Sequence, residues 1–129
     1  MGKLKVGIVG CGFIAKRRHI PGFLRLKKKD IVLQAVCDIN KPLAASVAKE
    51  FRIPKAYSSL SEMLSKEDLS IVDICTQPHI HAPLAIEAMK SGCHILLEKP
   101  MALKVSDCDQ MINISQEYGL KLCVVHNEI

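Results

Sequence analysis

Short apolar runs alternate with segments of helical periodicity along the whole chain, and no linker-like stretch separates them. Strands are predicted at residues 4–9, 32–37, 56–57, 71–75, 94–97 and 121–125. Strands that are joined through helices run parallel by right-handed crossovers. The pattern therefore predicts a single α/β domain with a doubly wound parallel sheet of the Rossmann type. Functional groups are then expected in the loops at the carboxyl edge of the sheet.

The predicted helices carry signals that fix their ends. N-caps are expected at Asn40 and Ser59, and two helices are expected to end at Gly92 and Gly119. Pro21 lies inside the first helical segment, so that segment is expected to kink or split there.

Composition supports an aliphatic core and excludes several classes of protein. Of the 129 residues, 49% are hydrophobic and only 4% are aromatic, which suits buried parallel strands better than a β-sandwich. The six cysteines are scattered singly, without metal-ligand spacing. No metal site is predicted, and a reduced, cytoplasmic protein is expected.

The net charge of +5 comes largely from two basic clusters, residues 16–18 and 27–29, with no aromatic residues interleaved. Solvated helix faces are favoured over a nucleic-acid patch, although Lys16 or Arg17 could help to neutralise a phosphate. No signal peptide or membrane-spanning run is found, so neither nucleic acid nor membrane is an expected partner.

A glycine-rich loop follows the first predicted strand and leads directly into a helix. It reads Gly10-Cys11-Gly12-Phe13-Ile14-Ala15, a G-x-G-x-x-A motif. Gly10 permits the tight turn, Gly12 lets the backbone approach a pyrophosphate, and Ala15 allows close helix packing. In this strand–turn–helix context the loop predicts a dinucleotide site at the helix N-terminus.

Asp38 ends the second predicted strand, 23 residues beyond Ala15. A carboxylate at this place in a dinucleotide fold binds the ribose hydroxyls and repels a 2′-phosphate, which favours NAD over NADP. Lys41, three residues later, means that NADP is not excluded as the cofactor. The alternative role for Asp38 is a cap for the following helix.

Polar groups also follow the fourth and fifth predicted strands. His79 and His81 lie two residues apart, so at most one would point inward as a ligand, and a cap or cofactor-edge role is favoured over metal. Glu98 and Lys99 could form an ordinary surface pair. However, a lysine at the end of a buried strand in a ligand crevice is costly unless its charge is used.

Together these motifs resemble the nucleotide-binding domain of the Gfo/Idh/MocA family of oxidoreductases. The resemblance covers essentially the whole chain. Its most specific element is the tripeptide Glu98-Lys99-Pro100 after the T-x-P-x-x-H loop at residues 76–81. The closing segment, His126-Asn127-Glu128, also fits, whereas Gln77 stands where many relatives have proline.

The resemblance implies roles for particular residues. Lys99 would contact cofactor and substrate and assist proton movement, Glu98 would orient the site, and Pro100 would set the direction of the lysine. Thr76 and Pro78 would line the nicotinamide side, with His81 beginning the helix behind them. The expected cofactor-contacting set is Gly10, Cys11, Gly12, Phe13, Ile14, Asp38, Thr76, Gln77, Pro78, His81, Glu98, Lys99 and Pro100.

The resemblance further implies an NAD(P)-dependent dehydrogenase that transfers hydride between the nicotinamide and a sugar, inositol or related polyol. Residues 1–125 would form the cofactor domain, and residues 126–129 would begin the connection to an absent C-terminal substrate domain, which also supplies the usual catalytic histidine. This chain is then expected to bind cofactor without turnover and to self-associate as a homo-oligomer. The alternatives are a stand-alone NAD-sensing regulatory module and, less favoured, a methyltransferase-type nucleotide domain.

Overall fold

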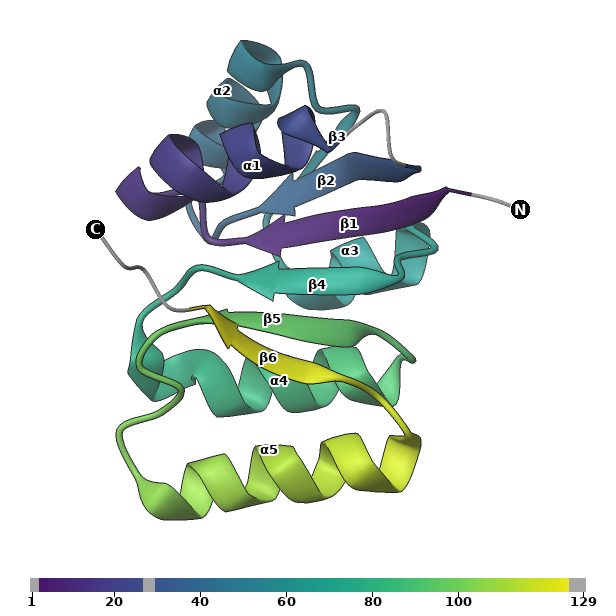
Figure 1. The fold of residues 1–129 in the computed structure, drawn as a ribbon. Helices are drawn as coiled ribbons and strands as arrows, with labels where there is room; N and C mark the ends of the chain where they lie inside the picture. Colours follow the sequence, from purple (N-terminus) through teal and green to yellow (C-terminus); the bar gives the residue numbers. More distant parts are fainter. Residues whose placement is uncertain (1–2, 27–29, 126–129) are drawn as a thin grey trace.

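The computed structural model describes residues 3–26 and 30–125 as a six-stranded parallel sheet flanked by helices (Figure 1). The strand order is β3-β2-β1-β4-β5-β6. All the strand pairs are parallel, and the order reverses between β1 and β4. The predicted fold class is confirmed, and the switch point of the sheet, where such folds bind ligands, lies at the ends of β1 and β4.

The elements follow the predicted alternation, and every strand end lies within one residue of its predicted position. In chain order they are β1 (Leu4–Val9), η1 (Ala15–His19), α1 (Ile20–Arg25), β2 (Ile31–Cys37), α2 (Lys41–Phe51), β3 (Lys55–Tyr57), α3 (Leu60–Lys66), β4 (Ile71–Ile74), η3 (Pro78–Ile80), α4 (His81–Lys90), β5 (His94–Glu98), α5 (Val105–Tyr118) and β6 (Leu122–Val125).

Each face of the sheet has its own aliphatic core. Helices α1 and α2 cover one face, where Ile8, Ile20 and Val47 are buried together (Figure 1). Helices α3, α4 and α5 cover the other face, where Met63 and Met111 are fully buried. Since both faces are covered at β1 and β4, the carboxyl edge is the accessible part of the central strands.

The predicted helix signals act as expected. The Asn40 side chain accepts a hydrogen bond from the Leu43 N–H at 3.1 Å at the start of α2. Ser59 caps α3 in the same way, accepting from the Glu62 N–H at 3.1 Å. Gly119 follows α5 with φ +66°, a left-handed conformation that other residues rarely adopt.

The first helical segment is split, as Pro21 predicts. Residues 15–19 form a π-helical turn, and α1 then begins at Ile20 with Pro21 in its first turn. Because proline has no N–H, it cannot donate the next hydrogen bond of the helix, and a wider turn accommodates it. The π-helical turn ends at His19, which is buried.

Within the described ranges, no helix combines the length and the apolar character that crossing a membrane requires.

Candidate functional site

A cleft of about 660 Å³ opens at the carboxyl edge of the sheet, over the ends of β1, β2 and β4. The glycine loop, Asp38 and the loop after β4 all contribute to it. The predicted residues among those that line the cleft are Gly10, Gly12, Asp38, Thr76, Gln77 and Pro78. The topology therefore brings together segments that are up to 68 positions apart in the sequence.

The two glycines of the loop meet different requirements. Gly10 has φ +95°, and a Cβ placed on it would lie 2.9 Å from the carbonyl oxygen of Cys75. Gly10 is therefore required by the backbone itself. A Cβ on Gly12 would meet no atom within 4 Å, so its small size is not needed for packing. It leaves open the space where the loop faces the cleft.

Asp38 holds the glycine loop from the end of β2. Its Oδ2 accepts a hydrogen bond from the Cys11 N–H at 2.9 Å, and its Oδ1 accepts from the Asn40 N–H at 2.9 Å. The helix cap itself is Asn40, so Asp38 is not the cap that the alternative interpretation suggested. Each carboxylate oxygen keeps a second lone pair for a ligand in the cleft.

Two basic residues near the loop use their charges elsewhere. Lys16 forms an ion pair with Glu50 at 3.3 Å, and the Arg17 guanidinium lies over the Phe13 ring, 5.5 Å from its centroid. With Cys11, these residues line a smaller hollow beside the loop rather than the main cleft. This placement offers no support for the suggestion that Lys16 or Arg17 neutralises a phosphate in the cleft.

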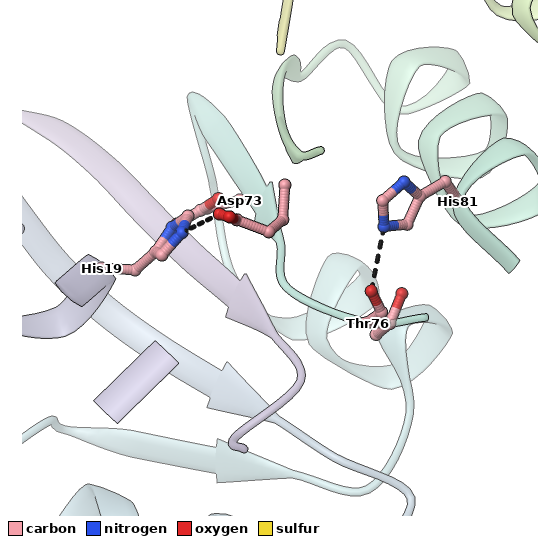
Figure 2. Close-up of polar contacts among 5 residues, drawn as sticks. His19, Asp73, Thr76 and His81 are labelled. Atoms are coloured by element: carbon pink, nitrogen blue, oxygen red, sulfur yellow. Dashed lines mark hydrogen bonds and ion pairs between the residues drawn. The ribbon is translucent and has the colours of Figure 1, made fainter. Parts of the chain in front are cut away.

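His81 lies behind the cleft lining and connects two loops. It is completely buried, and its Nε2 lies 3.0 Å from the Thr76 carbonyl oxygen (Figure 2). Its Nδ1 lies 3.0 Å from the carbonyl oxygen of Met101, in the loop after β5. His79 is exposed, so the two histidines face different ways, as predicted. Since His81 is not part of the lining, its contacts assign it to holding the loops.

The Glu98-Lys99-Pro100 segment leaves the sheet at the end of β5, the strand next to β4. Glu98 is buried as the last residue of β5, whereas Lys99 and Pro100 are exposed and joined by a cis peptide bond. These three residues and Ile14 lie outside the lining of the cleft. Lys99 therefore follows directly after a buried strand and is accessible to solvent, next to the strand β4 at the switch point.

A buried cluster beside the cleft was not predicted. His19 Nδ1 lies 2.5 Å from Asp73 Oδ2, and His19 Nε2 lies 2.5 Å from Glu98 Oε2. Figure 2 shows the contact between His19 and Asp73. We call these three residues the buried triad. One signal could have found it: Asp73 is an acidic residue within an apolar strand, and such a group needs a partner when buried.

Comparison with known proteins identifies the family. Residues 4–126 match the family described as an oxidoreductase family with an NAD-binding Rossmann fold. The chain belongs to the Gfo/Idh/MocA family. The resemblance drawn from the glycine loop and the Glu98-Lys99-Pro100 segment is thereby confirmed.

Individual Gfo/Idh/MocA relatives are similar over nearly the whole chain. The chain is 30% identical to levoglucosan dehydrogenase of Pseudarthrobacter phenanthrenivorans, covering 98% of this chain and 34% of the relative. It is 30% identical to D-apiose dehydrogenase of Paraburkholderia graminis, covering 97% and 32%. The WlbA dehydrogenase of Bordetella pertussis, solved with NADH and UDP-GlcNAcA, superimposes with a TM-score of 0.89 at 31% identity, covering 96% and 35%. The chain spans about a third of the length of these relatives.

In this Gfo/Idh/MocA domain the pKa values of His19, Asp73 and the nearby Cys75 are raised. Burial alone would lower the pKa of His19, but hydrogen bonds and charges from Asp73 and Glu98 outweigh it and raise that pKa. Burial raises the pKa of Asp73. It also raises the pKa of Cys75 above its usual range, with the charges of Asp73 and Glu98 adding to the effect. Cys75 is therefore held as a neutral thiol and is not an activated nucleophile.

The spacing of His19 and Asp73 fits a hydrogen bond between them better than two ligands of one metal ion. Ligand atoms of His19, Asp73 and Cys75 lie within 4.8 Å of one another, a separation that a metal ion could bridge. However, His19 Nδ1 and Asp73 Oδ2 are only 2.5 Å apart. Two ligands of a tetrahedral zinc ion stand roughly 3.3 Å apart, given bond lengths near 2 Å. A proton between the two atoms accounts for the shorter separation.

The raised pKa values predict how stability changes with pH. A group whose pKa is raised in the folded chain takes up protons on folding, so its stabilising contribution is complete below the ordinary pKa. That contribution is lost as pH rises through the folded-state value. For His19 the ordinary value is 6.5, and for Asp73 it is 3.8. We expect the part of the unfolding free energy due to His19 and Asp73 to fall as pH rises above these values.

Urea unfolding of the unaltered chain and of His19→Gln, across a series of pH values, measures this contribution. The difference in unfolding free energy between the two should shrink as pH rises above 6.5, the ordinary pKa of His19, because the variant lacks the ring whose pKa is raised by folding. Asp109→Asn, which removes an exposed acidic group on α5, is the matched control. A difference that stays constant with pH would contradict the assignment of the titration to the triad.

Proposed function

We propose that this chain binds NAD(H) in the main cleft and forms the cofactor-binding part of a dehydrogenase acting on a sugar, inositol or related polyol. The observation that carries the proposal is that the G-x-G-x-x-A loop and Asp38 face one cleft at the switch point of the sheet. Family membership supports the cofactor. The names of the levoglucosan and D-apiose dehydrogenases support the substrate class.

The residues present fit a dinucleotide. The open space at Gly12 lets the backbone approach a pyrophosphate, and the helical segment that follows offers N–H groups and a positive dipole end. Asp38 would accept hydrogen bonds from the adenosine ribose hydroxyls. Its negative charge favours NAD over NADP, because a 2′-phosphate there would be repelled. Thr76, Gln77 and Pro78 would line the nicotinamide side.

When bound, NAD⁺ supplies a hydride acceptor and NADH a hydride donor. The contribution of this chain to the reaction would come from Lys99. Its ammonium group can donate a hydrogen bond to the reacting oxygen of the substrate, stabilise negative charge there and pass on a proton. Glu98 and the contacts of His81 would fix the loops on both sides of this lysine.

Residues 126–129 lie outside the described residues, and we propose that they begin the connection to a substrate domain. The relatives are about three times as long as this chain, which is consistent with a further domain in the whole protein. The chain by itself would then bind cofactor without turnover. Lys99 is exposed and outside the cleft lining, so the cost expected for a lysine buried in a crevice does not arise. We favour a dehydrogenase over a stand-alone NAD sensor because the family that the chain matches is described as an oxidoreductase family.

Calorimetric titration with NADH and NADPH tests the cofactor assignment. We expect the unaltered chain to bind NADH at least about tenfold more tightly than NADPH, a difference of about 1.4 kcal/mol. Asp38→Ala removes the ribose contact and the hydrogen bond to the Cys11 N–H. It should weaken NADH binding by about 10- to 100-fold, as expected for a hydrogen bond to a charged group, and weaken NADPH binding less. Equal affinity of the unaltered chain for the two cofactors would contradict the role of Asp38.

A further inference from the structure

The buried triad joins three segments that meet at one edge of the sheet. His19 ends the π-helical turn, Asp73 lies in β4, and Glu98 ends β5. The two contacts of His19 span 54 and 79 positions of sequence. Ionisable groups are costly to bury, and apolar side chains of similar size often pack in such places at lower cost. The arrangement therefore indicates a role beyond holding the core together.

The triad holds two protons among three groups. Each ring nitrogen of His19 faces a carboxylate oxygen at 2.5 Å, so each contact needs one proton between the two atoms. Whichever atoms carry these protons, the triad has a net charge of −1. Among the residues that the structure describes, the other ionisable groups near His19 include Cys75, directly after β4, and Arg17, Arg18 and Arg25, which line a hollow with it.

The position of the triad connects it to both sides of the proposed nicotinamide site. Asp73 lies two residues before Cys75, which lines the cleft and is followed by the Thr76 loop. Glu98 comes directly before Lys99. A charged hydrogen bond is directional as well as strong. The backbones of β4 and β5 are paired as far as Ile74 and Leu97, and the contact of His19 with Glu98 holds the residue directly after that pairing. An apolar cluster would not impose the same direction.

We propose that His19 and Asp73 are positioning residues, which act through Glu98 to hold Lys99 at the nicotinamide side of the cleft. The proposal rests on the proposed function, since it requires that NADH binds in this cleft near Lys99. It assigns a role to two residues that the glycine loop, Asp38 and the Glu98-Lys99-Pro100 motif leave unexplained.

Chemical labelling shows whether Lys99 lies beside bound NADH, and it does so independently of how tightly NADH binds. The chain is acetylated with trace acetic anhydride, with and without saturating NADH, and the extent of modification at each lysine is measured by mass spectrometry. In the unaltered chain, NADH should protect Lys99 but not Lys90, which is exposed at the end of α4. In Asp73→Asn the protection of Lys99 should be lost, while the NADH affinity stays within about threefold.

Two further variants keep the test decisive if Asp73→Asn does not fold. Glu98→Gln and His19→Gln each retain hydrogen-bonding atoms but change the proton content of the triad, and both should lose protection of Lys99 in the same way. Asp109→Asn is the matched acid-to-amide control and should keep it. A cooperative urea unfolding transition for each variant shows that the variants compared are folded.

Nuclear magnetic resonance of the His19 ring tests the triad itself, independently of cofactor. Across about pH 5 to about pH 8, where an ordinary histidine titrates, both ring nitrogens of the unaltered chain should remain engaged with protons. Asp73→Asn should bring a titration of His19 into this range, because one group that raises its pKa is removed. A free histidine peptide, recorded under the same conditions, serves as the reference.

The outcomes are distinguishable. Persistent protection of Lys99 in folded Asp73→Asn and Glu98→Gln would overturn the positioning role, and so would an ordinary titration of His19 in the unaltered chain. Failure of NADH to bind the unaltered chain would instead overturn the proposed function. If NADH binds but does not protect Lys99 of the unaltered chain, the placement of this lysine beside the cofactor is wrong, and the positioning role is overturned with it.

Discussion

Replacing Gly10 by alanine is expected to unfold or strongly destabilise the chain. The φ of +95° disfavours any residue with a Cβ, and the new methyl group would lie 2.9 Å from the Cys75 carbonyl oxygen and 3.1 Å from Cγ2 of Thr76. The first of these neighbours is backbone at the end of β4 and cannot move aside easily. The combined cost of strain and overpacking is about 2–4 kcal/mol. Urea unfolding measures it, and NADH affinity should fall with it because the loop must shift.

The matched substitution at Gly12 should separate folding from binding. A Cβ on Gly12 meets no atom within 4 Å, and the backbone there does not require glycine. Gly12→Ala should therefore leave the unfolding free energy within about 0.5 kcal/mol. Its methyl group would nevertheless occupy the space where a pyrophosphate approaches the loop, so NADH affinity should fall at least about tenfold, or about 1.4 kcal/mol.

A third glycine provides the control for this pair. Gly22 lies in α1, and a Cβ there also meets no atom within 4 Å. Gly22→Ala should bind NADH normally and be equally or slightly more stable, since alanine favours the helix. If Gly12→Ala binds NADH as well as Gly22→Ala does, the phosphate-binding role of the loop is contradicted.

The fold was predictable because its signals are local. Each strand is an apolar run bounded by turn or cap residues, and the alternation with helices leaves one simple arrangement, the doubly wound parallel sheet. Pro21 correctly predicted where the first helical segment is split. That the split takes the form of a π-helical turn depends on how residues 15–19 pack on the sheet. The glycine loop and Asp38 were predictable because the motif has a fixed place in this topology.

The buried triad and the two hydrogen-bond contacts of the His81 ring could not be predicted in the same way. The contacts of His19 join positions 54 and 79 residues apart, and no spacing rule relates them. Their meeting depends on where the π-helical turn places His19 against β4 and β5. His81 was expected to begin the helix behind the nicotinamide side, and α4 does begin at this residue. Its place at the cofactor edge stays a prediction. Its two hydrogen-bond partners, the carbonyl oxygens of Thr76 and Met101, lie in loops whose paths the sequence does not specify.

The largest effect on reaction rate is expected from Lys99. In the whole protein, with a sugar or polyol found to be oxidised by screening, Lys99→Met should lower turnover by about 10²- to 10⁴-fold, the usual contribution of a group that moves a proton or stabilises charge on oxygen. Methionine keeps the length and the apolar part of the side chain but removes the ammonium group. Lys90→Met, at the exposed end of α4, is the matched control and should turn over normally.

Cofactor affinity should respond differently from turnover in Lys99→Met. The contacts that would dominate NADH binding come from the glycine loop and Asp38, which lie at the ends of β1 and β2, whereas Lys99 follows β5. Titration should therefore give an NADH affinity within about threefold of the unaltered protein. A loss confined to turnover is the signature of an interaction made in the transition state. Near-normal turnover would leave Lys99 without a catalytic role, and a parallel loss of affinity would make it a cofactor-binding residue instead.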